Sequence, residues 1–162
     1  VCSSDLLLKI YIMPLTAGQI PKVANVLNGG VAVLTGTTIG TLGSNTNGVT
    51  GYTAGSQGGR IISLTASTND TTTVNVFVYI YRGATVIPIG LVNIPLSSGN
   101  TNAARFVVDF LNGTNIPGLP VDNTGRQYIP LLAGDVLKFT TLANLTGTNS
   151  AWIAISGLDY QA

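Results

Sequence analysis

The stretch Thr73–Tyr81, with the sequence TVNVFVYIY, decides the fold class of this chain. Its residues alternate with a period of two, as in a β-strand whose successive side chains point to opposite faces of a sheet. Because the second face is aromatic rather than charged, we expect it to be covered or amphipathic, and we expect the strand to be central to its sheet. The first face would carry Val74, Val76, Val78 and Ile80, and the second Asn75, Phe77, Tyr79 and Tyr81.

Similar patterns lie on both sides of this strand. In Arg60–Ser67 the core face would carry Ile62, Leu64 and Ala66. After Tyr81, the residues Arg82-Gly83-Ala84-Thr85 predict a turn into a second apolar run, Val86–Ile94. The prolines in and after that run favour an edge or irregular strand, because proline cannot donate to the ladder of a central strand.

The C-terminal half continues the series of strands and turns. A loop rich in Pro, Gly and Asn is expected over residues 112–127. Ala133-Gly134-Asp135 predicts a tight turn that pairs the strands on either side of it. The expected strands are Ala103–Leu111, Tyr128–Leu132, Val136–Leu142 and a closing strand, Ala151–Leu158.

The N-terminal third carries weaker signals. Pro21 and the apolar residues after it could begin a short helix that ends at Gly29, or they could form a strand leading into an Asn28-Gly29 turn. The helical or irregular alternative is slightly favoured. Val31–Leu34 predicts a short strand, and residues 36–59 predict a surface loop or a pair of weak edge strands around residues 37–42.

Short strands separated by turn signals indicate an all-β fold: a single β-sandwich of jelly-roll type with about eight antiparallel strands. Residues 60–162 would form the sandwich core. Residues 13–59 would form an N-terminal arm and a long loop of the same domain.

The first twelve residues are expected to be a non-native leader. Residues 1–6, VCSSDL, match the translation of a common sequencing-adapter end, so Met13 would be the true start. The alternative is a signal-peptide core over residues 6–12, which Lys9 interrupts. Without the leader the chain loses Cys2, its only cysteine, and then has no disulfide and no thiol chemistry.

The inventory of catalytic side chains is small. The chain has no His and no Glu, which excludes a Ser-His-Asp triad and histidine metal sites. We therefore expect no enzyme activity, no cofactor and no metal site, and an Asp-dependent hydrolase is the remote alternative. Asp122-Asn123-Thr124-Gly125 offers clustered oxygens but fits a polar turn better than a calcium loop. Asp70, Asp122 and Asp135 are expected to bind their own turns, and Asp109 to face outward.

The aromatic face of the best strand is the candidate binding surface. Phe77, Tyr79 and Tyr81, with Arg82 at the strand end, could form a platform for a partner or a sugar. Such a row more often packs beneath a loop or a neighbouring subunit. Trp152 is expected in the core, with its N–H bonded to a carbonyl.

Charge is scarce, since charged residues make up 8% of the chain and the net charge is +1. No basic patch with interleaved aromatics supports nucleic-acid binding. No apolar run reaches the length of a membrane span. Identical copies would repel one another only weakly, so we expect a homo-oligomer.

Six stretches follow one another in the order NGVTGY (47–52), VFVYIYRG (76–83), DFLN (109–112), IPGLP (116–120), LAGD (132–135) and GLDY (157–160). With this order of signals the chain resembles small accessory virion proteins of tailed bacteriophages. The resemblance covers about two thirds of the chain, from residue 47 onward. It implies a β-sandwich displayed on a virion, docked on a capsid or tail protein, with a trimer favoured and no catalytic residues. The alternative is a carbohydrate-binding module or adhesin domain that uses Tyr79 and Tyr81 to bind a surface glycan.

Overall fold

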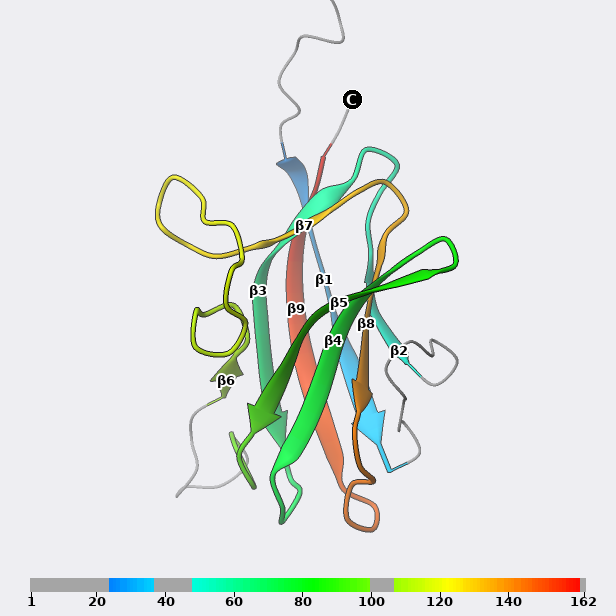
Figure 1. Cartoon of the computed structure of the whole chain (residues 1–162), viewed down its shortest axis with the longest axis vertical. Helices are drawn as coiled ribbons and strands as arrows, with labels where there is room; N and C mark the ends of the chain where they lie inside the picture. Colours follow the sequence, from blue (N-terminus) through cyan, green and yellow to red (C-terminus); the bar gives the residue numbers. More distant parts are fainter. Residues whose placement is uncertain (1–23, 37–47, 100–106, 161–162) are drawn as a thin grey trace, which may run out of the picture.

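The computed structural model describes residues 24–36, 48–99 and 107–160, and it is all-β throughout these ranges (Figure 1). The strands form two antiparallel sheets. The first sheet has the order β1-β9-β3-β6, with β7 also paired to β3, and the second has the order β2-β8-β4-β5. The strands are β1 (Ala24–Thr35), β2 (Val49–Thr53), β3 (Gly59–Thr68), β4 (Val74–Arg82), β5 (Thr85–Ile94), β6 (Val108–Asp109), β7 (Ile129–Leu131), β8 (Val136–Thr141) and β9 (Ser150–Tyr160).

The order of the strands is that of a jelly roll, as predicted. The chain passes repeatedly from one sheet to the other, and only β4 and β5 are consecutive neighbours within a sheet. β6 pairs with Thr65 and Ala66, while β7 pairs with Gly59–Ile61 on the same strand, β3. The two short strands therefore share one position in the sheet, so nine strands occupy eight places.

The core lies between the sheets and is filled by the inward faces of both. β4 is an interior strand between β8 and β5, and Val76 and Val78 on it are fully buried. This confirms the prediction for Thr73–Tyr81. The β4–β5 hairpin closes through Gly83-Ala84, where Gly83 has φ +60°, and the proline-containing β5 is an edge strand, both as predicted.

The prediction for residues 24–30 was wrong. β1 runs through Asn28 and Gly29 without a turn, because it pairs with β9 along almost its whole length. Because Gly29 has no side chain, the backbones of β1 and β9 can lie close together there. A Cβ at this position would lie 2.9 Å from the carbonyl oxygen of Ile155. The sandwich therefore begins at β1, not at Arg60. The leader, the residues from Met13 to Val23 and the edge strands expected at 37–42 lie outside the described residues.

The turn at Ala133-Gly134-Asp135 was placed correctly, but its neighbours were paired wrongly. β7 pairs with β3 in the first sheet, whereas β8 pairs with β2 and β4 in the second. The turn carries the chain from one sheet to the other. A hairpin and a crossover can use the same turn residues, so the local sequence does not distinguish them.

Two further placements need correction. The pairing of β3 with β9 shifts register between Ile61 and Ser63, so Ile61 enters the core and Ile62 does not. Such a bulge inserts one residue and reverses the face of those that follow. Trp152 is half-buried on the outward face of β9, between the inward Ala151 and Ile153. Of the strand expected at Ala103–Leu111, residues 103–106 lie outside the described ranges.

Candidate functional site

The predicted aromatic platform lies on the face of β4 that points away from the main core. The rings of Phe77 and Tyr79 stack with their centroids 5.5 Å apart, and both residues are buried, with 7% and 1% exposure. Gly48 lies directly against the Tyr79 hydroxyl. Burial raises the pKa of Tyr79, whose hydroxyl has no hydrogen-bond partner in the described part of the chain. Neither ring is presented to a ligand.

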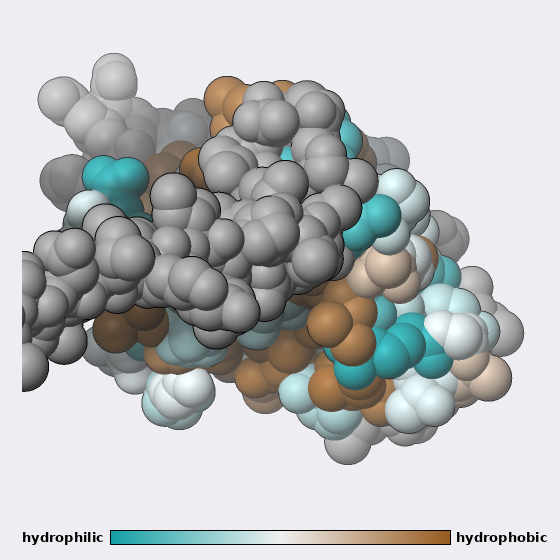
Figure 2. All heavy atoms as spheres, turned by 90° about the horizontal axis from the view of Figure 1, so that it is seen from above, coloured by the Kyte–Doolittle hydropathy of each residue, from teal (hydrophilic) through white to brown (hydrophobic). Residues whose placement is uncertain are grey.

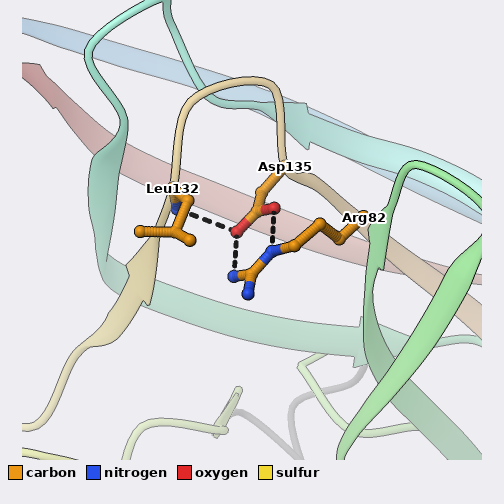
Figure 3. A network of polar contacts seen from close by, with 3 residues as sticks. All are labelled: Arg82, Leu132 and Asp135. Carbon is orange, nitrogen blue, oxygen red and sulfur yellow. Dashed lines mark hydrogen bonds and ion pairs between the residues drawn. The ribbon is translucent and has the colours of Figure 1, made fainter.

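Tyr81 and Arg82 remain accessible, but each already has a partner within the chain. Lys138 Nζ lies 5.3 Å from the centroid of the Tyr81 ring. Arg82 binds Asp135 through two parallel hydrogen bonds, Nε to Oδ1 and Nη2 to Oδ2, both 2.7 Å long (Figure 3). A binding role for these four residues stays a prediction.

Asp135 is fully buried, which sequence reasoning did not anticipate. Besides Arg82, it accepts a 2.8 Å hydrogen bond from the backbone N–H of Leu132 across the crossover turn. The bonds from Arg82 lower the pKa of Asp135 despite its burial. The group therefore holds the end of β4 against the turn between the sheets, as Figure 3 shows.

Two other carboxylates hold loops, and neither forms an ion pair with a cation of the described residues. Asp70 is buried and accepts hydrogen bonds from the N–H and hydroxyl of Thr72 and of Thr146, at 2.7–3.0 Å. Burial would raise the pKa of Asp70, but these bonds outweigh it and lower the pKa. Asp159 accepts from the Tyr52 hydroxyl at 2.7 Å and from Gly55 N–H at 3.1 Å, and its pKa is lowered against the same opposing effect of burial.

Asp109 and Asp122 behave as the sequence predicted. Asp122 Oδ1 binds the N–H and hydroxyl of Thr124 and the N–H of Arg126, which makes a polar turn. Asp109 is exposed and accepts from Leu111 N–H. Within the described ranges, no group of three or more His, Cys, Asp or Glu side chains is arranged to hold a metal ion.

A groove that sequence reasoning missed runs along the outer side of β3. Two adjoining hollows of about 580 and 420 Å³ share Ile62, Arg126 and Gln127 as lining residues. We call this feature the β3 groove. Its walls come from β3, from Leu158 of β9 and from the loop that joins β6 to β7, which lies at the left in Figure 1. The further lining residues include Arg60, Ser63, Thr65, Asp109, Asn112, Asp122 and Tyr128.

An uncharged surface lies on the same outward face of this sheet, toward the edge formed by β1. Leu27, Val31 and Val33 of the edge strand β1 are 68%, 61% and 40% exposed. They stand opposite Leu158, Ala154 and Trp152 of β9. We call these six residues the uncharged face. Apolar side chains also reach the surface in the view from above (Figure 2).

Comparison with protein-family models, with curated proteins and with solved structures gave no match. None of the described residues belongs to a helix long and apolar enough to cross a membrane.

Proposed function

We propose that this protein is a non-enzymatic structural or accessory protein of a virus particle: a head decoration, fibre or tail-associated protein. It would act by docking on a capsid or tail protein and by self-association, with a trimer as the favoured state. The resemblance to small phage virion proteins supports this assignment. So does the jelly-roll topology, which recurs in capsid proteins and also in lectins, so that the fold alone does not decide between them.

The uncharged face is the observation that carries the proposal. Three large apolar side chains stand exposed on one edge strand, next to the half-buried Trp152. Contiguous exposed apolar surface in a folded protein usually marks an interaction site. The oligomer interface expected at Phe77, Tyr79 and Tyr81 is therefore moved to β1 and β9, because the chain itself buries Phe77 and Tyr79.

A second copy of the chain is the occupant that this surface fits best. No charged residue occurs from Leu27 to Val33 or from Trp152 to Leu158, so two copies can approach without repulsion between like charges. The position of β1 at the sheet edge also leaves one side of its backbone without a neighbouring strand among the described residues. An edge of this kind favours pairing or packing against another copy.

The self-association is tested by light scattering coupled to size exclusion over a range of concentrations. We expect a mass three times the 16.7 kDa of one chain. Val31→Glu should shift the protein toward the monomer, because it places a charge in the interface of every copy. The matched control is Leu91→Glu, an exposed apolar residue on β5 at the edge of the other sheet, which should leave the mass unchanged. A monomer at every concentration, or dissociation by Leu91→Glu alone, would contradict the proposed interface.

The virion assignment has a separate test. Mass spectrometry of purified virus particles from the source material should detect the tryptic peptide of residues 106–126, which follows Arg105 and ends at Arg126. Its absence from particles whose capsid peptides are well covered would rule out a virion role.

A further inference from the structure

We propose that the β3 groove is a binding site for a neutral oligosaccharide. The loop that forms its wall follows the edge of the first sheet opposite β1, far from Val31 and Val33, although Leu158 of the uncharged face also lines the smaller hollow. The groove is distinct from the buried rings of Phe77 and Tyr79. The inference does not depend on self-association.

The groove exists because one strand position of the jelly roll is interrupted. β6 leaves the sheet after Asp109, and β7 rejoins β3 only at Gly59–Ile61. Opposite this gap, the bulge at Ile61–Ser63 turns Ile62 out of the core and into the groove lining. Bulges of this kind re-aim side chains and occur often beside functional sites.

The wall opposite β3 is held in place. Ile116, in the middle of the loop, is buried in the core, and a Cβ at Gly90 of β5 would lie 3.2 Å from its side chain. Asn112 Oδ1 accepts hydrogen bonds from the N–H groups of Thr114 and Asn115. A bridge between Val121 and Gln127 closes the turn that Asp122 stabilises. A preformed wall of this kind reduces the ordering cost of binding a ligand.

Two arginines in the groove keep donors that no described residue binds. Among the described residues, the side chains of Arg60 and Arg126 make no hydrogen bond and no ion pair within 4.0 Å, although the charge of Arg60 acts on Asp122, whereas Arg82 binds Asp135 through Nε and Nη2. Gln127 adds a buried amide oxygen that has no partner in the same part of the chain. The groove therefore offers donors and an acceptor that the fold itself does not use.

The balance of charge selects the class of ligand. The groove is lined by two cations, Arg60 and Arg126, and by two carboxylates, Asp109 and Asp122. The two carboxylates offset the attraction that the two arginines would exert on an anionic ligand such as a phosphate, so the groove has no excess of positive charge to select an anion. A hydroxyl group both donates and accepts, so a ligand rich in hydroxyls matches a mixture of guanidinium, carboxylate and amide groups.

Tyr128 supplies the aromatic element of the site. The Arg60 guanidinium carbon lies 5.5 Å from the centroid of the Tyr128 ring, so the two side chains form one wall of the groove. An aromatic ring offers apolar surface to the C–H groups of a sugar, while its hydroxyl keeps a polar tip. The larger hollow, of about 580 Å³, lies within the usual range for small-molecule sites, and the smaller one extends it toward Tyr128.

The experiment uses the full chain on an array of neutral and acidic oligosaccharides, followed by calorimetric titration with the neutral oligosaccharide that binds best. We expect Tyr128→Ala and Arg126→Gln to weaken binding at least about tenfold, as removal of a central contact does. Tyr81→Ala is the matched control, because Tyr81 also carries a cation over its ring but lies on β4, away from the groove. Its affinity should stay within about twofold of the unaltered protein.

Other outcomes would overturn the inference. If no neutral oligosaccharide on the array binds, the groove is not a saccharide site. A preference for acidic glycans, with affinity that falls steeply between about 0.05 and 0.5 M salt, would contradict the neutral class. Loss of binding in Tyr81→Ala but not in the groove variants would place the site on β4. Arg126 is exposed and supports no other side chain among the described residues, so Arg126→Gln tests the site even if Tyr128→Ala lowers stability.

Discussion

Arg82 and Asp135 form a bidentate pair that joins the last residue of β4 to the turn between β7 and β8. The Arg82 side chain is 45% exposed, while that of Asp135 is fully buried. The pair therefore presents one partner to solvent and the other to the interior. Arg82 offsets the energetic cost of burying the Asp135 carboxylate, which lies where the chain crosses between the sheets.

Removal of the cation should destabilise the fold more than loss of an ordinary surface charge. Arg82→Gln removes the positive charge and the two guanidinium hydrogen bonds, and the Leu132 N–H is the one other donor to the buried Asp135 carboxylate among the described residues. Unpaired buried charges are strongly unfavourable. Thermal unfolding at neutral pH should show a clear fall in Tm for Arg82→Gln. It should show almost no change for Arg126→Gln, whose side chain has no partner among the described residues. Equal melting temperatures in the two variants would mean that the Arg82–Asp135 pair does not contribute to the stability of the fold.

Stability should decline on acidification because the pKa values of Asp70, Asp135 and Asp159 are lowered in the folded state. A lowered pKa means that the unfolded chain binds more protons. The stabilisation is therefore complete above the unfolded pKa of about 4 and is lost as pH falls through the folded values. The chain has no His, so no histidine titrates between about pH 5 and 8. We expect Tm to be flat across that range and to fall below it.

Asp70→Asn provides the control for this pH dependence. The asparagine side chain has one acceptor oxygen where aspartate has two, and its NH2 group only donates. It therefore cannot replace all four bonds from Thr72 and Thr146. The variant should melt at a lower temperature at neutral pH and should lose less on acidification. If Tm falls with decreasing pH as much in Asp70→Asn as in the unaltered protein, Asp70 does not contribute to the loss of stability in acid.

The centre of β4 should be sensitive to truncation. Val76→Ala and Val78→Ala each remove buried methyl groups and leave a small cavity, at a cost of roughly 1–3 kcal/mol. Asn75→Ala, at the exposed position between Val74 and Val76, should change the free energy of unfolding by no more than about 0.5 kcal/mol. Urea denaturation measures all three variants. Unchanged midpoints for both valine variants would contradict the burial of this face.

The loop beside the β3 groove should depend on Ile116. This residue is buried although it lies in a loop, so Ile116→Ala should cost about 2–5 kcal/mol. It should also increase proteolysis between residues 112 and 127, because the loop would lose its attachment to the core. Thr114→Ala, at an exposed position of the same loop, should leave both the stability and the cleavage rate nearly unchanged. Rapid cleavage of the unaltered protein in this loop would show that Ile116 does not hold it.

Local patterns determined the fold class and much of the strand list. Alternation in Thr73–Tyr81 was sufficient to place a central strand, and Gly83-Ala84 and Gly134 marked real turns. These features depend on a residue and its near neighbours, through the period of a strand or the backbone freedom of glycine. The polar turn at Asp122 was readable for the same reason, because its partners, Thr124 and Arg126, lie within four residues.

Only the tertiary structure decided what distant segments do to one another. Gly29 is in a strand because the backbone of Ile155 lies against it, and Asp135 is buried because Arg82 comes from another strand to pair with it. The β3 groove arises where a bulge at Ile62 meets a gap between β6 and β7, and neither has a local signature. The physical reason is the same in all three cases. The alternation within a strand predicts that one of its faces is buried, but the strand or loop that covers this face is set by pairings between residues far apart in the chain.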